Sequence, residues 1–432
     1  MSRRVICVNP PGLPGTTANR EGAGGMGNVY SQSGAFLYPP HMLAATAGAL
    51  REGGLEVSAR DCVLEGDSLA QAVTWAEAQQ PTWVVVQVSW ATWDPDEAFL
   101  RAARAALPDA SVVAVGASVT HMESALSQIP GIAWLRGEPE RLLGVFVANL
   151  GADTARWAGP LSLSMLSGPG LPDAQRLERL EGLPHPAWDL FPWRRYGMLT
   201  VVGSKGCGYA CTYCPYIVAQ GRKFRPRPIG ETVDELAWLA AEFKLTRVVF
   251  RDPVFGYDRG RVLSLCKEIK RRGVRLSWEC ESRADDLDGE LVAAMAKAGC
   301  ATVKLGLESA DADVLVAVRR VRDAAGAEVY RSRALAAAAA CKQHGVACRV
   351  FAMTGLPGET DRSVAETASL IREIQPAGLQ VKRVDWPTGR QADANIGEGA
   401  EERAKRLRDA WQPAQSPAKT SLLARVKGRL SR

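Results

Sequence analysis

GSKGCGYACTYCPY, residues 203–216, brings three of the ten cysteines of this chain within eight positions, at Cys207, Cys211 and Cys214. The segment directly follows LTVV, 199–202, a short apolar run that predicts a β-strand. Gaps of three and then two residues place three thiolates around one point of a loop. That loop lies at the carboxyl end of the strand, where the active sites of β/α barrels form. The segment therefore predicts a metal site.

Two kinds of metal site are compatible with three cysteines. Structural zinc takes four ligands in a closed tetrahedron, and no further Cys-x2-Cys or His-x3-His pair occurs elsewhere to complete one. An iron–sulfur cluster held by three cysteines instead leaves one iron open to a small molecule. The spacing favours the cluster, with zinc as the alternative.

A repeating strand and helix pattern continues from residue 198 to residue 390. The helix predicted at 232–243 opens with Thr232 and Glu235 as a capping box and then places apolar residues on one face. A closed barrel needs eight βα units, whereas this region contains six, so we predict a partial (β/α)6 barrel. Its strands are expected at 199–202, 247–250, 274–278, 302–306, 348–353 and 378–382.

Residues 1–150 alternate β-branched runs with helical patterns, which is typical of a parallel sheet covered on both faces. The chain is therefore predicted to be α/β, with an N-terminal doubly wound, Rossmann-like parallel sheet before the partial barrel. Residues 151–197 are a Pro- and Trp-rich connector, and 391–432 a basic, flexible tail. The strands are expected at 5–8, 84–88, 112–116 and 132–135, and the helices at 41–52, 67–79 and 95–106.

Composition excludes several other classes of protein. The 432 residues are 47% hydrophobic and 23% charged, ordinary values for a globular enzyme. No apolar run is long enough for a spanning helix or a signal peptide, and ten irregularly spaced cysteines indicate reduced thiols in a cytoplasm.

The net charge of +6 is accounted for by residues 401–432, with nine basic and three acidic side chains. A neutral body does not support nucleic-acid binding.

The barrel segments resemble the radical S-adenosylmethionine (SAM) enzymes. The resemblance consists of CxxxCxxC with Tyr213 before its last cysteine, followed in order by WECESRAD (278–285), AGCATVKLGLESAD (298–311) and MTGLPGETD (353–361). It implies that Cys207, Cys211 and Cys214 hold a 4Fe-4S cluster whose free iron binds SAM. It places Tyr213 among the cofactor-binding residues, and it implies a reducing partner such as a flavodoxin or ferredoxin.

The same resemblance assigns SAM-binding roles to residues that follow the third and fourth strands. Glu308 and Ser309 would contact the ribose and methionine of SAM, and the alternative is a helix cap. Arg283 would pair with the SAM carboxylate, because a guanidinium binds carboxylates in bidentate fashion. Its alternative is a surface ion pair with Asp285.

Two further strand ends complete the expected SAM site. Gly355, Pro357 and Gly358 would form a turn that lets the backbone approach adenine, and the alternative is an ordinary βα loop. Asp252 in FRDPVF would hold the SAM amine, although Arg251 beside it departs from the family pattern.

Residues 1–150 resemble the cobalamin-binding domain that precedes the barrel in one subclass of these enzymes. The matching segments are NPPG (9–12), YPP (38–40), VVAVGASVTHMES (112–124), RGEPE (136–140) and the connector PHPAWDLFPW. Val63 stands where the Asp-x-His-x-x-Gly motif would have its histidine, and His41 is expected to start a helix. We therefore expect a corrinoid without a histidine ligand, near Trp90 and Trp93. The alternative is a fold kept only as a scaffold.

The resemblance implies methyl transfer from SAM, through cobalamin, to an unactivated carbon of a small metabolite or peptide. The alternatives are radical SAM cyclisation, rearrangement or oxidation, and a silent cluster-binding scaffold. Tyr216, Trp278 and Glu281 are the candidates for shaping the substrate site at the barrel mouth. The remaining cysteines are expected to be buried apolar residues.

Overall fold

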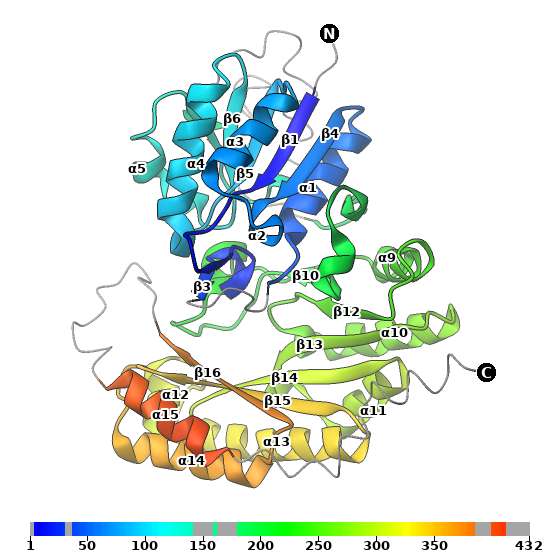
Figure 1. Cartoon of the computed structure of the whole chain (residues 1–432). Helices are drawn as coiled ribbons and strands as arrows, with labels where there is room; N and C mark the ends of the chain where they lie inside the picture. The colour runs from blue at the N-terminus through cyan, green and yellow to red at the C-terminus, as the bar shows by residue number, and fades with distance from the viewer. Residues whose placement is uncertain (1–3, 31–36, 141–158, 162–178, 385–398, 412–432) are drawn as a thin grey trace, which may run out of the picture. The chain divides into compact units, whose positions relative to one another are not determined.

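A computed structural model describes residues 4–30, 37–140, 159–161, 179–384 and 399–411 (Figure 1). The chain divides into two compact units. The first comprises 1–208, 214–253 and 271–277, and the second 209–213, 254–270 and 278–432. The boundaries predicted at 150, 197 and 390 stay predictions, and parts of the connector and of the tail lie outside the described residues.

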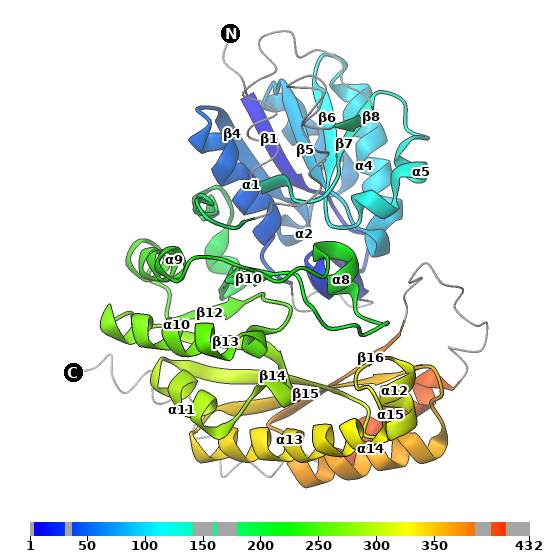
Figure 2. The same ribbon diagram turned by 180° about the vertical axis from the view of Figure 1, so that it is seen from behind.

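The N-terminal sheet is wholly parallel, in the order β4-β1-β5-β6-β7-β8. Its faces are covered by α3 (Leu69–Ala78) and α4 (Trp93–Ala106) on one side (Figure 1) and by α1 (His41–Glu52) on the other (Figure 2). This confirms the doubly wound sheet. Its strands are β1 (Arg4–Asn9), β4 (Glu56–Asp61), β5 (Trp83–Gln87), β6 (Ser111–Val115), β7 (Ile132–Leu135) and β8 (Gly159–Leu161).

Burial explains which of these strands were recognisable in the sequence. β5, β6 and β7 are buried along their whole length and are mostly apolar. β4 lies at the edge of the sheet and reads EVSARD, with only its last residue buried. Since an edge strand needs no continuous apolar run, the sequence did not predict β4.

The long segment after β1 folds over the carboxyl edge of the sheet. It forms the hairpin β2 (Thr17–Asn19) and β3 (Asn28–Tyr30), with the short helix η1 (Gly22–Gly25) between the two strands. Arg20, which is 2% exposed, pairs with Asp96 of α4 through Nε at 2.8 Å and donates through Nη1 to Asn9 Oδ1 at 2.9 Å. Asp96 also accepts from the Ser89 amide at 2.8 Å. The buried pair therefore fixes this segment to the loop after β5.

The second sheet has six parallel strands, as the partial barrel requires. In the first unit β12 pairs with β9, and in the second unit β14 pairs with β13 and β15, and β15 with β16. The strands are β9 (Leu199–Val201), β12 (Arg247–Phe250), β13 (Ser277–Arg283), β14 (Cys300–Glu308), β15 (Ala347–Thr354) and β16 (Gly378–Arg383). The main helices are α9 (Ile229–Glu242), α10 (Arg259–Arg271), α11 (Gly289–Lys297), α13 (Ala324–Gln343) and α14 (Asp361–Ile374).

Two local predictions in this region were wrong. Helix α9 begins at Ile229, without a side-chain cap, so Thr232 and Glu235 lie inside the helix. There Thr232 Oγ1 donates to Pro228 O at 3.0 Å, and Glu235 pairs with Arg227. Strand β13 was expected at 274–278 but runs from Ser277 to Arg283.

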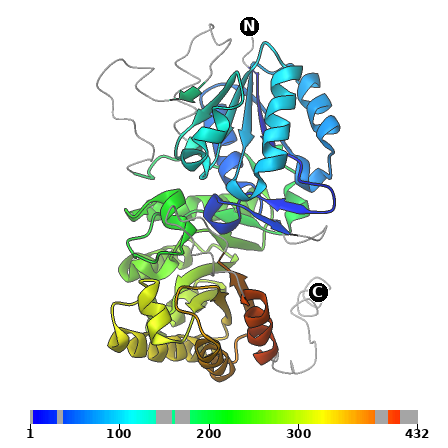
Figure 3. The ribbon, with the colours of Figure 1, turned by 90° about the vertical axis from the view of Figure 1, so that its left-hand side faces the viewer.

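One part of the segment that was expected to be a flexible tail is helical. Residues Ala400–Ala410 form helix α15, which packs beside α14 and β16 in the second unit (Figure 3). Leu407 is 1% exposed, and Arg403 pairs with Glu359 at 3.2 Å. Burial of this apolar face explains why the segment is ordered there. Within the described residues, no helix combines the length and apolar composition needed to cross a membrane.

Replacing Asp96 by Asn should destabilise the first unit by about 3–5 kcal/mol, because Arg20 would remain buried without its counter-charge. Glu56→Gln, which removes the exposed pair with Arg4, should cost about 1 kcal/mol or less. Hydrogen–deuterium exchange of peptides from 4–30 and 83–106 under native conditions measures both effects. Equal protection in the two variants would contradict the prediction.

Candidate functional site

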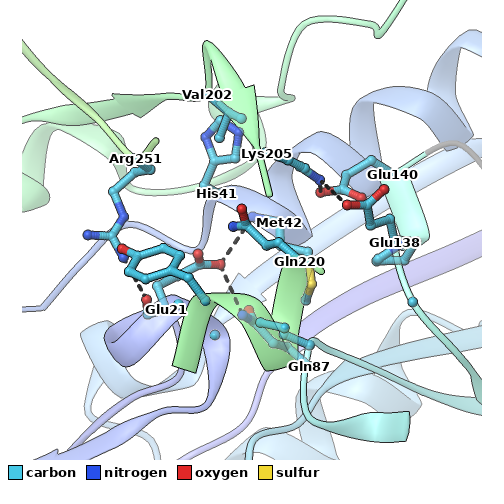
Figure 4. A pocket seen from close by; sticks show the side chains of 17 residues that line it. Glu21, His41, Met42, Gln87, Glu138, Glu140, Val202, Lys205, Gln220 and Arg251 are labelled. Carbon is cyan, nitrogen blue, oxygen red and sulfur yellow. Dashed lines mark hydrogen bonds and ion pairs between the residues drawn. The ribbon is translucent and has the colours of Figure 1, made fainter. Parts of the chain in front are cut away.

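A polar pocket lies in the first unit, at the carboxyl ends of strands from both sheets (Figure 4). Glu21, Gln87 and Glu140 reach it from segments that follow or end β1, β5 and β7, and Lys205 and Arg251 come from segments near the ends of β9 and β12. Ligands of doubly wound sheets bind at these strand ends. The pocket is therefore placed where the topology predicts a binding site.

Buried ion pairs fix one side of this pocket. Lys205 Nζ lies 2.5 Å from Glu140 Oε1 and 3.8 Å from Glu138 Oε1, and the Arg225 guanidinium binds Glu138 in bidentate fashion at 2.7 and 2.8 Å. Burial by itself lowers the pKa of Lys205, but Glu138 and Glu140 outweigh it and raise the pKa. These pairs join the loop after β7 to the hairpin of β10 (Ser204–Lys205) and β11 (Arg225–Pro226), whose strands flank the cysteine segment in the sequence.

Glu21 organises the opposite side of the pocket. Its Oε1 accepts from Gln87 Nε2 at 3.0 Å and from the Met42 amide at 3.1 Å, and its carbonyl accepts from Arg251 Nη2 at 2.9 Å. Burial raises the pKa of Glu21. Arg251, the departure noted in the sequence, thus has a defined position, stacked over the Tyr38 ring at 4.1 Å. The sequence analysis did not identify Glu21 or Gln87, because neither belongs to a recognisable motif.

Two buried oxygens in the pocket lining have no hydrogen-bond partner in the described part of the chain. They are Gln87 Oε1 and Glu140 Oε2, from side chains that are 2% and 6% exposed. A buried acceptor without a donor costs about 1–3 kcal/mol. The pocket is therefore suited to a ligand, or to water, that brings N–H or O–H groups.

His41 starts α1, as expected, and lines the pocket. Its Nδ1 lies 3.1 Å from the carbonyl oxygen of Thr200. Burial, with Lys205 as the next contribution, lowers the pKa of His41 to about 3. The imidazole is therefore neutral at physiological pH.

The three motif cysteines follow β10. Cys207 and Cys214 belong to the first unit and Cys211 to the second. Cys207 and Cys211 are about 5% exposed, and Cys214 precedes α8 (Pro215–Gln220) and is half-buried. Among the described residues, no three His, Cys, Asp or Glu side chains already form a metal-ligand set. The ligand set thus stays a prediction.

Asp252 is buried at the end of β12, where it supports the entry to the cysteine segment. Its Oδ1 accepts from the Gly203 amide at 2.8 Å, and its Oδ2 from the Ser204 hydroxyl at 2.6 Å. Both bonds fix the turn that leads from β9 into β10. In this structure Asp252 therefore positions the backbone before Cys207, and its contact with SAM stays a prediction.

In the second unit, two arginines direct guanidinium groups at Cys211. The Sγ atom lies 3.6 Å from Arg283 Nη1 and 3.8 Å from Arg320 Nη1, which also donates to the Tyr213 hydroxyl at 3.0 Å. The sequence analysis missed Arg320, because VRRVRD (318–323) has the pattern of an exposed charged run. Arg319 and Arg322 are indeed exposed, whereas Arg320 is buried.

Arg283 forms the ion pair with Asp285 that was the alternative to a SAM contact. Nε and Nη2 lie 2.9 and 2.7 Å from the two carboxylate oxygens. The pair is not on the surface, since only 4% of the Arg283 side chain is exposed. Burial opposes the charged form of Arg283, but Asp285 outweighs it and raises the arginine pKa.

The other predicted SAM residues lie at the ends of β14 and β15. Glu308 has a left-handed backbone, φ +64°, and its Oε1 lies 3.9 Å from Arg320 Nη2. Burial raises the pKa of Glu308. Ser309 Oγ accepts from the Asp311 amide at 3.2 Å, and Asp311 itself caps α12 (Ala312–Ala317). Ser309 thus supports the turn before that helix, in line with the helix-cap alternative.

The turn after β15 has the backbone form that its glycines predict. Gly355 and Gly358 both have φ +79°, and the Gly355 amide donates to Glu359 Oε1 at 3.2 Å. Pro357 and Gly358 are exposed. Thr354 Oγ1, just before the turn, is buried and has no hydrogen-bond partner in the described part of the chain.

The three candidate substrate residues lie in different environments. Tyr216 of α8 lines the pocket. Glu281 is half-buried on β13, with Oε1 4.0 Å from Lys304 Nζ. Trp278 is fully buried, and its indole N–H donates to Ala298 O at 2.8 Å. Because β13 starts near Trp278 instead of ending there, this side chain lies away from the carboxyl end of the strand, and its role at a substrate site stays a prediction.

Comparison with known proteins supports the resemblance found in the sequence. Residues 201–371 match the family model described as the Radical SAM superfamily. An uncharacterised methyltransferase of Pyrococcus horikoshii is 25% identical over 208 residues, which are 47% of this chain and 44% of that protein. Tryptophan 2-C-methyltransferase of Streptomyces laurentii is 27% identical over 210 residues, 45% of this chain and 34% of that protein. The chain thus spans less than half the length of these relatives.

Two solved structures share the fold. The radical SAM methyltransferase TsrM from Kitasatospora setae, solved with cobalamin and a [4Fe-4S] cluster bound, is similar over 89% of this chain and 75% of its own, with a TM-score of 0.66 and 20% identity. The cobalamin-dependent SAM radical enzyme OxsB, with aqua-cobalamin bound, is similar over 94% of this chain and 56% of its own, with a TM-score of 0.64 and 14% identity. At these identities the likeness confirms the α/β fold.

The depressed pKa of His41 predicts a specific pH dependence of stability. Below its ordinary value of 6.5, the unfolded chain binds a proton at His41 that the folded chain does not bind. The stability of the folded chain that depends on a neutral His41 is therefore lost as pH falls from about 6.5 towards 3. The free energy of unfolding falls by up to about 1.4 kcal/mol per pH unit in this range. In His41→Gln no histidine titrates at this position, so the variant does not lose stability in this way. The free energy of unfolding of the wild type should therefore approach that of the variant as pH falls. Urea unfolding at several pH values measures it, and a constant difference would contradict the prediction.

Proposed function

We propose, from the premise that residues 201–371 belong to the radical SAM superfamily, that this chain is an enzyme that cleaves SAM at a 4Fe-4S cluster on Cys207, Cys211 and Cys214. The observation that carries the proposal is the pair of guanidinium groups aimed at Cys211 Sγ, at the end of the barrel strands. A cluster ligand is a thiolate, and N–H donors with positive charge stabilise a thiolate. The two arginines therefore support a thiolate ligand at Cys211, and Cys207 and Cys214 complete the proposed set.

A buried hydroxyl at the end of β15 supports the proposed SAM site. Thr354 Oγ1 is a buried hydroxyl oxygen without a partner in the described part of the chain, next to the turn at Gly355. We assign SAM binding to this turn, with Pro357 and Gly358, and to Tyr213, Asp252, Arg283, Glu308 and Ser309. When bound, the cluster and SAM supply the homolytic chemistry that removes hydrogen from an unactivated carbon.

The chain's own contribution is positioning and exclusion of water. Asp252 holds the turn before Cys207 through two hydrogen bonds. In the first unit, Lys205 and Arg225 hold the β10–β11 hairpin against Glu138 and Glu140. Burial of Cys207 and Cys211 keeps bulk water away from the sulfur atoms.

We further propose that the N-terminal sheet binds cobalamin and that the reaction is methyl transfer to a small metabolite or peptide. The pocket offers Gln87 Oε1 and Glu140 Oε2 as acceptors, which fits a ligand carrying amide N–H groups, as a corrinoid does. The family match and the methyltransferase relatives support this proposal. Tyr216, which lines the pocket, stays a candidate for the substrate site together with Trp278 and Glu281. A reductant of the flavodoxin or ferredoxin type and a cytoplasmic location belong to the same proposal.

Cys211→Ala should lose nearly all cluster iron, because a three-thiolate set has no spare ligand. Cys266→Ala, at a buried cysteine of α10 outside the motif, is the control and should keep its iron. Glu308→Gln should also keep its iron but bind SAM about tenfold or more weakly, as expected for loss of a charged hydrogen bond. Iron analysis, EPR spectroscopy of the reduced protein and SAM-binding calorimetry after anaerobic reconstitution measure these effects. Full cluster content in Cys211→Ala would refute the assignment.

Product analysis separates methyl transfer from the other radical reactions. Turnover with cobalamin, SAM and substrate should release equal amounts of S-adenosylhomocysteine and 5′-deoxyadenosine for each methylated product, because one SAM donates the methyl group and another is cleaved. Mass spectrometry of the mixture measures all three. Release of 5′-deoxyadenosine without S-adenosylhomocysteine and without a methyl mass gain would establish the cyclase or oxidase alternative.

A further inference from the structure

A buried polar cluster of the second unit surrounds Cys211. Arg283 Nη1 and Arg320 Nη1 lie 3.6 and 3.8 Å from its Sγ, within the range of N–H···S hydrogen bonds. The two arginine side chains are only 4% and 7% exposed. They come from segments far apart in the chain, the end of β13 and the loop before α13. This sulfur atom is therefore held against two positive charges in a buried environment.

Arg320 is fixed in this position by several neutral acceptors. Its guanidinium donates to Gly306 O, to the Tyr213 hydroxyl at 3.0 Å and to the Tyr330 hydroxyl at 3.1 and 2.8 Å. The Tyr330 hydroxyl also donates to Gly306 O. These contacts leave the guanidinium little freedom to turn away from Cys211.

The two arginines differ in how closely their charges are balanced. Arg283 is bidentate with Asp285, with oxygens at 2.7 and 2.9 Å. Arg320 has Glu308 as its carboxylate partner, at the longer distance of 3.9 Å. More of the Arg320 charge therefore acts on its surroundings, and burial strengthens that action because the effective dielectric constant is low.

A positive charge and N–H donors at a ligand sulfur stabilise the more negative state of an iron–sulfur cluster. Hydrogen bonds to the sulfurs, net charge and solvent exposure are the known determinants of cluster potential. The reduced cluster carries one more electron than the oxidised cluster, and no bond is made or broken in the reduction. Arg320 should therefore shift the equilibrium towards the reduced cluster.

We infer that Arg320, assisted by Arg283, is a positioning residue that raises the reduction potential of the cluster on Cys211. The inference rests on the proposed function, because it requires that cluster. Its consequence is that a one-electron donor protein reduces this cluster more readily than it would without the two arginines. Glu308 opposes the effect, since its carboxylate offsets part of the Arg320 charge.

The test is a potentiometric titration of the reconstituted full chain, poised with a dithionite-type reductant and followed by EPR spectroscopy without SAM. In Arg320→Gln the ratio of reduced to oxidised cluster at a fixed potential should fall about tenfold. This corresponds to a decrease of about 59 mV in the one-electron reduction potential of the cluster. Arg320→Lys keeps the charge and should recover part of the loss. Glu308→Gln should shift the ratio in the opposite direction. Arg331→Gln removes a partly exposed arginine of α13 that pairs with Glu373 and should leave the ratio unchanged.

Iron content separates the two hypotheses. Wild-type protein without a cluster would refute the proposed function. A wild-type cluster together with an unchanged ratio in Arg320→Gln, or a shift as large in Arg331→Gln, would overturn the inference alone. If Arg320→Gln does not retain iron, Glu308→Gln decides the question: a rise in the reduced fraction supports the inference, and an unchanged fraction overturns it.

Discussion

A charge that is removed from water must be paired or hydrogen-bonded, and this constraint shapes the carboxyl ends of the strands in both units. In the first unit, Arg20 meets Asp96, and Lys205 and Arg225 meet Glu138 and Glu140. In the second unit, Arg283 meets Asp285. Most of these pairs join segments that are distant in sequence, so the loops around the pocket and the cysteine segment are fixed by charge pairing in addition to apolar packing.

The same constraint identifies where ligands are needed. Most buried charges in these clusters have partners, whereas a few buried polar oxygens in the described residues do not, among them Gln87 Oε1, Glu140 Oε2 and Thr354 Oγ1. These atoms lie in the pocket lining of the first unit or at the end of β15 in the second unit, where the proposed function places cofactors. An unpaired acceptor at a strand end is a reason to expect a ligand there.

Much of the fold could be predicted from periodicity, because buried parallel strands are continuous apolar runs. The strands at 132–135 and 247–250 have the predicted bounds. The failures have separate causes. β4 is polar and lies at a sheet edge, and β13 contains Glu279, which is buried with its Oε2 atom 3.5 Å from Lys304 Nζ. A charged residue in a strand predicts an exposed position when only the sequence is known. The partner that allows Glu279 to be buried belongs to another strand, so the sequence does not indicate it.

For the site, the sequence by itself determined the cysteine spacing, the glycine turn after β15 and the order of the strand-end motifs, because each depends on residues that are neighbours in the chain. The tertiary structure decided which side chains meet. It showed Arg320 turned inward between exposed Arg319 and Arg322, Trp278 at the buried start of β13, and Glu21 and Gln87 together in the pocket. These facts depend on contacts between segments far apart in sequence, and burial then gives the contacts their electrostatic strength.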